Sequence, residues 1–408
     1  MSMSRTNAGH HHNAMAARQH DAGGPVWLSA TAGLCASLVG LGLARFAYTP
    51  LIPALIAAKW FTPSQAVYLG AVNLAGYLAG TLVARSLGER LGAVGTLRGV
   101  MVLASLCCFA CAVPLSFLWF FAFRFLAGLT GGVIMVLAAS TILPHTAANK
   151  RGVVGGVIFA GVGLGVAASG TLVPLLLQQG LMQAWIGLGA LSAMLTLASW
   201  KAWPSDVAVK AEAPAARTAR SPLVVLLCGQ YGLNALALVP HMVFRVDFVA
   251  RGLGQGITAG AHYWVLYGLG AVVGPLLAGH LADRSGFAPA LRVALLMQAI
   301  AVVLPVISTA PAAMIVSSLI VGGFTPGIVP LVIGRIHELV PHSAAGQRAA
   351  WAQATTTFAV FQAAGAYGLS FVFERTGGDY ALLFMIGAAA VAAALVIDLL
   401  GAVVVGRN

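Results

Sequence analysis

Charged residues are scarce in this sequence. Asp, Glu, Lys and Arg together make up 8% of its 408 residues, whereas a soluble globular domain carries roughly 25%. Hydrophobic residues make up 60%, too many to be hidden in one or two water-soluble cores. An ordinary cytosolic enzyme is therefore excluded. Intrinsic disorder is excluded too, because disordered chains combine low hydrophobicity with high net charge. The solvent of most of the chain must be lipid.

Acidic residues are scarcer than basic ones, with 10 Asp and Glu against 22 Lys and Arg, so the net charge is +12. In a soluble chain this surplus would suggest nucleic-acid binding. Here the basic residues form short clusters between apolar runs, and no patch interleaves aromatic residues with Lys and Arg as a base-stacking surface requires. We therefore expect no nucleic-acid partner.

Cysteine is rare as well, and all five cysteines lie inside apolar runs. Cys108 and Cys111 form a CxxC pair, but a redox or zinc site needs polar access and, for zinc, a second pair of ligands. We interpret them as small packing residues. His10, His11 and His12 could bind a metal, but we interpret the polar segment that holds them as a disordered tail. No metal and no cofactor is expected.

Long apolar runs dominate the rest of the chain. A helix that crosses a bilayer needs about 20 apolar residues, and interruptions by charge, Pro or Gly separate twelve such runs. Pro50, Pro53 and Pro240 are the expected bend points of the first and seventh runs. The predicted spans are 26–58, 66–84, 94–112, 116–140, 153–177, 182–203, 222–248, 262–282, 290–308, 312–334, 348–372 and 380–405.

The polar segments between the spans predict domains and orientation. Residues 1–24 form a cytoplasmic tail without a signal peptide, and the Ala/Pro-rich residues 204–221 form a cytoplasmic linker between bundles at 25–203 and 222–405. With both termini in the cytoplasm, sixteen Lys and Arg fall on that side and four outside, namely Lys59, Arg245, Arg251 and Arg375. Lys and Arg concentrate on the cytoplasmic side of membrane proteins, so this split fixes the orientation.

One internal repeat is clear. The octet PHTAANKR at Pro144–Arg151 returns as PHSAAGQR at Pro341–Arg348, each in the loop after the fourth span of its half. Because each half holds an even number of spans, the two copies have the same orientation. Parallel repeats related by an axis along the membrane normal are typical of transporters in which a solute path runs between two bundles.

Three segments carry a resemblance to a known family. Gly279–Gly286 (GHLADRSG), between the eighth and ninth spans, resembles the G-x-L-A-D-R-x-G signature of the major facilitator superfamily, and Arg124–Gly132 (RFLAGLTGG) resembles its fourth-helix motif. Gly42–Pro53 (GLARFAYTPLIP) is similar to the first helix of the bacterial YbfB/YjiJ-like subgroup. The resemblance implies an all-α fold of twelve transmembrane helices in two pseudo-symmetric six-helix bundles, in a bacterial inner membrane.

Two arginines lie well inside the predicted spans and not near an end, Arg45 in the first span and Arg124 in the fourth. An unpaired guanidinium inside the membrane costs several kcal/mol, so each needs water, a partner or a ligand. The resemblance places the first and fourth helices beside a central cavity, which both side chains could line. The alternative is that they pair with backbone carbonyls or extend to the lipid headgroups.

The acidic residues fall elsewhere. Asp247, Glu374 and Asp379 are placed at the outer side, and only Asp398, in the twelfth span, is at membrane depth or at the inner interface. A cavity with fixed cations and no carboxylate suits an anionic solute, since Arg binds carboxylate or phosphate through two parallel hydrogen bonds. Exporters of cationic drugs are expected to carry an acid there.

Other polar side chains on the spans complete the candidate set. His241 could titrate near neutral pH and carry a coupled proton, with Arg124 as a second coupling residue. It could equally be a hydrogen-bonded packing residue. The remaining predicted substrate-binding residues are Tyr48, Asn73, Tyr77, Tyr267 and Gln362. The resemblance assigns a gate on the inner side to Gly279, Asp283, Arg284 and Gly286.

These observations predict a secondary active transporter, not an enzyme, that works by alternating access. The expected partner is a small organic anion, coupled to a proton or exchanged for a second anion, and the protein is expected to be monomeric in its lipid surroundings. One alternative is an exporter of hydrophobic drugs or metabolites in which Arg45 is structural. Another is a membrane sensor that transports nothing.

Overall fold

The computed structural model describes residues 26–147, 150–204, 221–341 and 343–405. Twelve helices in this part of the chain are long and apolar enough to cross a membrane, as the sequence predicts. The predicted tail, most of the predicted linker, and Ala148, Asn149 and His342 of the repeated octets lie outside the described residues.

The first six spans are continuous helices except for the first, which changes its winding midway. Their elements are α2 (Val26–Ser37), the π-helix η1 (Leu38–Phe46), α3 (Tyr48–Ala57), α4 (Pro63–Leu91), α5 (Ala93–Ala110), α6 (Phe117–Ile142), the short 3₁₀ helix η2 (Leu143–His145), α7 (Arg151–Leu177) and α8 (Leu181–Ser199).

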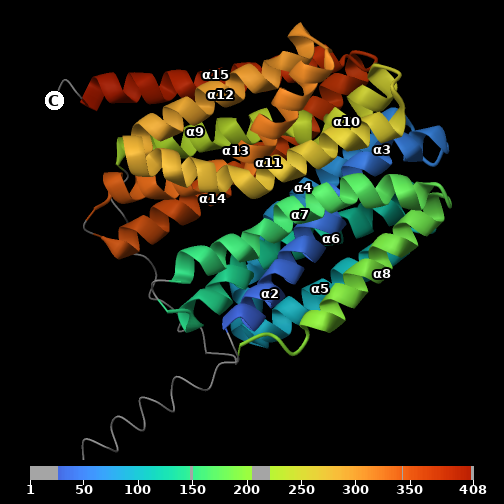
Figure 1. Cartoon of the computed structure of the whole chain (residues 1–408), viewed down its shortest axis with the longest axis horizontal. Coiled ribbons are helices and arrows are strands. Elements are labelled where there is room, and N and C mark those ends of the chain that lie inside the picture. The colour runs from blue at the N-terminus through green and yellow to red at the C-terminus, as the bar shows by residue number, and fades with distance from the viewer. Residues whose placement is uncertain (1–25, 148–149, 205–220, 342, 406–408) are drawn as a thin grey trace, which may run out of the picture.

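The second six spans follow the same order, and again the first of them is irregular. Their elements are α9 (Pro222–Val239), the π-helix η4 (Pro240–Phe244), α10 (Arg245–Asp247), the π-helix η5 (Phe248–Gly252), α11 (Gly256–Ser285), α12 (Phe287–Ile307), α13 (Pro311–Leu339), α14 (Ala344–Arg375) and α15 (Tyr380–Val405). Figure 1 shows the two sets of helices as two bodies lying side by side.

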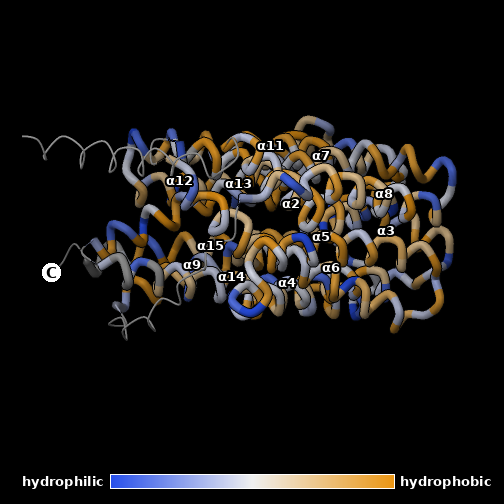
Figure 2. Tube along the Cα trace, turned by 90° about the horizontal axis from the view of Figure 1, so that it is seen from below, coloured by the Kyte–Doolittle hydropathy of each residue, from blue (hydrophilic) through white to orange (hydrophobic). Residues whose placement is uncertain are grey.

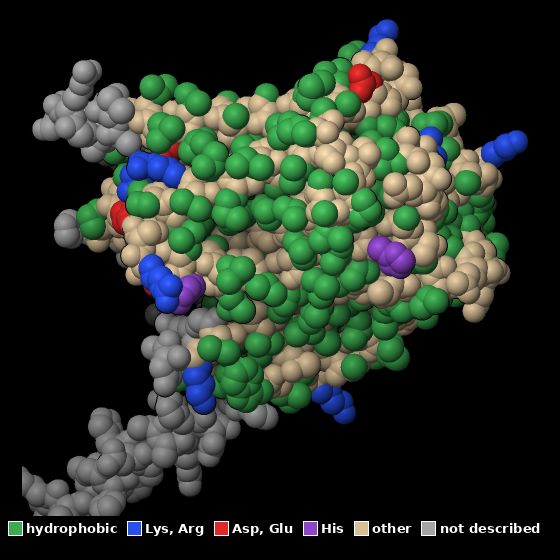
Figure 3. Space-filling model, turned by 45° about the horizontal axis from the view of Figure 1, so that its top comes forward, with side chains coloured by type: hydrophobic (Ala, Val, Ile, Leu, Met, Phe, Trp, Pro, Cys, Tyr) green, Lys and Arg blue, Asp and Glu red, His purple; other side chains and the backbone are tan. Residues whose placement is uncertain are grey.

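The surface of the molecule is suited to lipid. Hydrophobic side chains cover the flank of the helices, whereas charged side chains gather toward the two ends (Figure 3), and the backbone trace is likewise most hydrophilic at the ends (Figure 2). Leu82, Leu118, Leu197 and Leu276 are all more than 60% exposed on this flank. An apolar surface of this extent indicates contact with a bilayer.

The first and seventh spans depart from α-helical winding near their prolines. In η1 the wide turns give a hydrogen bond from Ala47 N to Gly42 O, five residues back, at 3.0 Å. Pro53 lies inside α3, and Pro240 begins η4. Because proline has no N–H to donate, it disturbs the regular ladder of helix hydrogen bonds. Such π-helical turns occur frequently at functional sites.

The second and fourth helices of each half are in backbone contact. In the first half, a Cβ at Gly128 of α6 would lie 1.9 Å from the carbonyl oxygen of Asn73 on α4. In the second half, a Cβ at Gly274 of α11 would lie 1.9 Å from the carbonyl oxygen of Gly323 on α13. Only glycine fits at either position, and small residues of this kind let membrane helices approach closely.

Contacts between the two halves gather toward one end. We call the end at which α2 begins and α15 ends the terminal face, and the opposite end, at which α3 ends and α11 begins, the distal face (Figure 1). In the described chain, α3 packs on α10, α4 on α14 and α7 on α11. Thr49 Oγ1 donates to Met242 O at 2.6 Å, and Trp264 Nε1 donates to Ser169 Oγ at 3.1 Å. The rings of Tyr68 and Tyr367 meet at 6.5 Å. These residues all belong to the middle or distal parts of their helices, so the halves are joined there.

Two residues that the sequence analysis placed at the outer side are inside the protein. Arg245 and Asp247 are both 0% exposed, in a span that runs from Pro222 to Gly252. Asp247 forms a bidentate ion pair with Arg251 and accepts from Tyr380 Oη, all at 2.5 Å. The span continues beyond residue 248 as η5 to Gly252, so these residues lie in the span and not in a loop, and this cluster satisfies the charges there.

Candidate functional site

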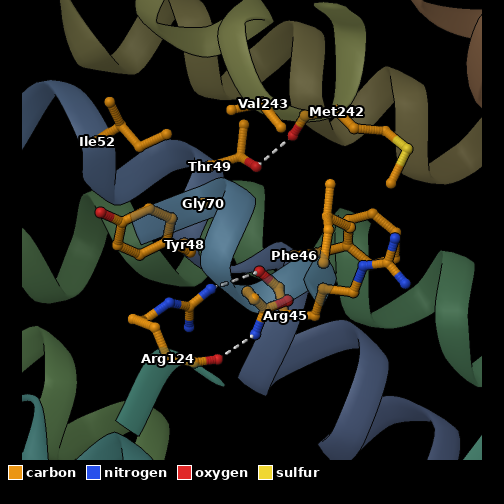
Figure 4. A pocket seen from close by; sticks show the side chains of 11 residues that line it. Arg45, Phe46, Tyr48, Thr49, Ile52, Gly70, Arg124, Met242 and Val243 are labelled. Atoms are coloured by element: carbon orange, nitrogen blue, oxygen red, sulfur yellow. Dashed lines mark hydrogen bonds between the residues drawn. The ribbon is translucent and has the colours of Figure 1, made fainter. Parts of the chain in front are cut away.

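A small cavity lies where the first span meets α4, α6 and the seventh span (Figure 4). Its volume is about 20 Å³, and four predicted substrate-binding residues line it, namely Arg45, Tyr48, Asn73 and Arg124. The remaining lining residues are apolar or small: Phe46, Thr49, Ile52, Gly70, Leu74, Met242 and Val243. Both halves of the molecule therefore contribute to the cavity.

Arg45 is buried in the π-helical part of the first span. Its Nη2 donates to Gln362 Oε1 on α14 at 2.7 Å, so this bond crosses between the halves. The guanidinium also lies over the rings of Tyr77 at 4.4 Å and Phe46 at 5.0 Å, as in cation–π pairs. Among the described residues Arg45 Nε has no hydrogen-bond partner, and no carboxylate forms an ion pair with the side chain.

Arg124 is equally buried but has different partners. From α6 its Nη1 donates to the carbonyl oxygen of Ala44 at 2.7 Å, and its Nη2 lies 3.5 Å from the carbonyl oxygen of Arg45. Its guanidinium is 4.2 Å from the ring centroid of Tyr48. In Figure 4 it turns toward the backbone of the first span, whereas the side chain of Arg45 extends away from it. The side chain of Arg124 thus holds η1 in place by binding two of its main-chain carbonyl oxygens.

Asn73 and Tyr48 fix the walls of the cavity. Asn73 Nδ2 donates to the carbonyl oxygen of Arg124 at 3.0 Å, and Tyr48 Oη donates to the carbonyl oxygen of Ala66 at 2.7 Å. Asn73 Oδ1 is buried and has no partner among the described residues. A buried polar atom without a partner in the protein is a candidate for contact with a ligand or water.

Tyr77, Tyr267 and Gln362 extend the site beyond the cavity wall. Tyr77 and Gln362 both contact Arg45, from α4 and α14 respectively. Tyr267 on α11 shares a hydrogen bond with Thr325 at 2.5 Å and stacks on Trp264 at 4.9 Å. Since the rings of Trp264 and Phe46 lie 6.1 Å apart, aromatic rings run from Phe46 in one half to Tyr267 in the other, and the guanidinium of Arg45 lies between Phe46 and Tyr77. Seven of the eight predicted substrate-binding residues therefore lie in or around one place.

His241 is the exception. It is fully buried within the second half, where its Nε2 lies 2.8 Å from Ser317 Oγ and its ring meets Phe384 at 5.1 Å. Ser317 Oγ donates its own proton to the carbonyl oxygen of Ala301 at 2.7 Å, so it must accept from His241. The proton of the neutral ring is therefore on Nε2. Nδ1 has no partner among the described residues.

The four predicted gating residues lie at the terminal face, where α11 ends. Asp283 and Arg284 are exposed, and neither forms an ion pair or hydrogen bond with another described residue. Gly286 has a φ of +82°, a conformation that favours glycine, and its N–H bonds back to Ala282 O at 2.8 Å. A Cβ at Gly279 would meet nothing within 4 Å. In this conformation the segment forms a sharp turn between α11 and α12.

Comparison with known proteins agrees with this architecture. Residues 37–399 match the family described as "Uncharacterised MFS-type transporter YbfB". The chain belongs to this family. This YbfB-type transporter is similar in structure to the nucleoside transporter NupG, solved as a point mutant, with a TM-score of 0.75 over 91% of this chain and 99% of that one. At 12% identity the similarity shows the fold alone. No curated protein matches the sequence.

The family implies a multi-pass membrane transporter with a small-molecule substrate. In the described part of this YbfB-type transporter, no cluster of His, Cys, Asp and Glu could hold a metal ion. All five cysteines are buried and free, including Cys108 and Cys111.

The sequence analysis did not identify one buried charged residue of the YbfB-type transporter, Arg245. Arg245 donates through Nη2 to Met314 O at 2.8 Å and to Ser318 Oγ at 3.1 Å, within the second half. The predicted span 222–248 already contained Arg245, and this was the signal that could have placed it inside the membrane. Its guanidinium also lies over the ring of Tyr263 on α11, and it is not among the residues that line the cavity.

Proposed function

We propose that this transporter carries a small organic anion, with Arg45 binding the anionic group. The observation that supports this most is the partner of Arg45. Its buried guanidinium donates to a neutral amide oxygen, Gln362 Oε1, and no carboxylate contacts it among the described residues. Burying an uncompensated arginine in the membrane is costly, so a carboxylate on Arg45 would bind more strongly than the amide it replaces.

The same contact suggests how binding and movement are coupled. Arg45 belongs to the first half and Gln362 to the second, so their hydrogen bond ties the two together. An anion that takes the place of Gln362 removes this link and forms its own contacts. A ligand shifts a conformational equilibrium when it binds the two states differently, and rocking of the halves about a central site is the expected form of alternating access.

The alternatives make different demands on Arg45. A neutral solute, such as the nucleoside of the NupG title, or a hydrophobic drug could use the aromatic rings around the cavity without needing the charge. In that case Arg45 is structural. A sensor that transports nothing would bind ligand but move none across the membrane.

Orientation and location are also part of the proposal. The Lys and Arg distribution supports a cytoplasmic terminal face and a distal face outside a bacterial inner membrane, although Arg245 no longer counts among the outer residues. The contacts at the distal side then correspond to closure toward the outside. Exposed Asp283 and Arg284 are free to form gate contacts when the inner side closes. We expect a monomer.

The proposal includes two forms of coupling: exchange for a second anion, or movement with a proton carried by His241. His241 Nδ1 has a free lone pair among the described residues, so it could accept a proton. Arg124 is a weaker coupling candidate, because carbonyl oxygens hold its guanidinium.

The test of the anion site uses two matched substitutions at Gln362. Gln362→Glu places a carboxylate of the same shape 2.7 Å from Arg45 Nη2, where it forms a permanent ion pair. We expect this variant to lose at least 100-fold in affinity for benzoate, measured by isothermal titration on purified protein, and to lose benzoate uptake in proteoliposomes.

The control is Gln362→Met, which has similar length and no competing oxygen. Without the hydrogen bond from the charged guanidinium to Gln362, worth about 1.5–3 kcal/mol, benzoate no longer has to displace the amide and should bind at least about tenfold more tightly. If the Glu and Met variants bind benzoate equally, Arg45 is not the anion site and the proposal fails.

A further inference from the structure

Three polar atoms of residues that line the cavity are buried without a partner among the described residues: the donors Arg45 Nε and Arg124 Nε, and the acceptor Asn73 Oδ1. Because two main-chain carbonyl oxygens already hold the guanidinium of Arg124, a ligand is expected to use the donor Arg45 Nε and the acceptor Asn73 Oδ1. The amide orientation of Asn73 is fixed, because the carbonyl oxygen of Arg124 accepts from its Nδ2 and leaves Oδ1 on the other side. A ligand that satisfies both atoms must present an acceptor to Arg45 and a donor to Asn73.

The cavity offers one cation to a ligand. Arg124 already donates to the carbonyl oxygens of Ala44 and Arg45, and Arg245 is bonded to Met314 and Ser318 on α13. Of the two arginines that line the cavity, only Arg45 donates to a side chain, the amide of Gln362, which can move away. The site therefore suits one negative charge, and a second carboxylate would be buried without a partner.

Aromatic rings surround this single cation. The guanidinium of Arg45 lies over Tyr77 and Phe46, and the rings continue through Trp264 to Tyr267, which stack with an interplanar angle of 14°. These side chains come from α4, the first span and α11. Flat rings pack against such surfaces in stacked or edge-to-face geometry.

Together these features extend the proposed function to a substrate class. We infer that the anion is an aromatic monocarboxylate that carries a hydroxyl group. The inference rests on the proposed anion site at Arg45. The carboxylate binds Arg45 in place of Gln362, the ring packs against Tyr77 and Phe46, and the hydroxyl donates to Asn73 Oδ1.

Room for the ring must come from side chains that can move. At about 20 Å³ the cavity is now large enough for little more than one water molecule. Gln362 Nε2 has a weak partner, Met242 Sδ at 3.5 Å, and both residues have long, flexible side chains from the second half. Their withdrawal opens the space next to Arg45 and loosens the contact between the halves.

The test is a ligand series on the full-length wild-type protein in detergent, measured by isothermal titration. The probes are benzoate, the three hydroxybenzoate isomers, cyclohexanecarboxylate, phthalate and benzamide. We expect benzoate to bind about tenfold more tightly than cyclohexanecarboxylate, and one hydroxybenzoate isomer about tenfold more tightly than benzoate. Phthalate, with two charges, should bind more weakly than benzoate.

The outcomes separate the two proposals. If cyclohexanecarboxylate matches benzoate, or if no hydroxyl isomer exceeds benzoate, the inference is overturned while the anion site stands. If no hydroxyl isomer exceeds benzoate, a water molecule and not the ligand donates to Asn73 Oδ1. If benzamide matches benzoate, the anion site itself fails. In Asn73→Leu the ratio of hydroxybenzoate to benzoate affinity should fall to about one, and a preserved ratio contradicts the role of Asn73. Should that variant not fold, the wild-type series decides.

Discussion

Arg45 and Arg124 are two buried arginines that line the same cavity, and they differ in the kind of hydrogen-bond acceptor that each guanidinium contacts. Arg124 donates to the main chain of the first span, at Ala44 and Arg45. Arg45 donates to a side-chain amide from the opposite half. Both guanidinium groups lie over an aromatic ring, at 4.2 Å for Arg124 and 4.4 Å for Arg45.

The difference separates structure from binding. Backbone carbonyls in a packed helix cannot move away, so Arg124 stabilises the π-helical turn for as long as the protein is folded. The amide of Gln362 can rotate away, so its place on Arg45 can be taken by another acceptor. Burial alone does not distinguish these two roles. They are distinguished by whether the hydrogen-bond acceptor is a fixed main-chain carbonyl or a side chain that can move.

The largest effect is expected from Arg124→Gln, which removes the hydrogen bonds to η1. Hydrogen bonds to a charged group contribute about 1.5–3 kcal/mol each, so the free energy of unfolding should fall by about 3 kcal/mol or more. Thermal unfolding of purified protein in detergent measures this loss. Arg335→Gln, on an exposed pair with Glu338, is the matched control and should change stability by less than about 1 kcal/mol. If Arg124→Gln keeps wild-type stability but loses benzoate binding, Arg124 is a binding residue and not a structural one.

A smaller effect on stability and a selective effect on binding are expected from Arg45→Gln. Arg45→Gln removes one hydrogen bond to a movable side chain, whereas Arg124→Gln removes two to the main chain, so the free energy of unfolding should fall by less. The loss of a carboxylate pair worth about 3 kcal/mol corresponds to roughly 100-fold weaker benzoate binding. Titration and thermal unfolding on the same preparation measure both. Should Arg45→Gln unfold as readily as Arg124→Gln, Arg45 is structural and the hydrophobic-exporter alternative is favoured.

The fold could be predicted from the sequence because lipid imposes a simple pattern. Twelve apolar runs, the repeated octet and the GHLADRSG segment sufficed for the number of spans and the family. The end of the seventh span was predicted four residues too early, at 248 and not at Gly252, because Asp247 and Arg251 resemble the start of a polar loop in the sequence. Only the packing shows that Asp247 pairs with Arg251 and Tyr380 inside the protein.

The site was predictable in its members but not in their roles. A charge inside an apolar run identifies Arg45 and Arg124 without any structure. Whether the partner is a carbonyl or an amide depends on contacts between residues far apart in sequence, such as Arg45 with Gln362 and Arg124 with Ala44. Residue type does not reveal this. His241 shows the same limit, since its helix position gave no sign that it faces Ser317 and Phe384.

The smallest effect on binding is expected at His241, which extends the comparison to a residue outside the cavity. Like Arg45, it has a ring or guanidinium nitrogen without a partner among the described residues, but its contacts lie within the second half. If His241 carries the coupled proton, His241→Gln should leave benzoate affinity within about twofold and abolish uptake driven by a pH gradient. Exchange of labelled for unlabelled benzoate needs no net proton movement and should continue. Proteoliposomes with and without a pH gradient measure both activities.

Two results would contradict this role of His241. Undiminished uptake in the pH gradient would exclude His241 as the proton carrier and favour anion exchange. Loss of exchange as well as uptake would assign His241 to the packing of the second half.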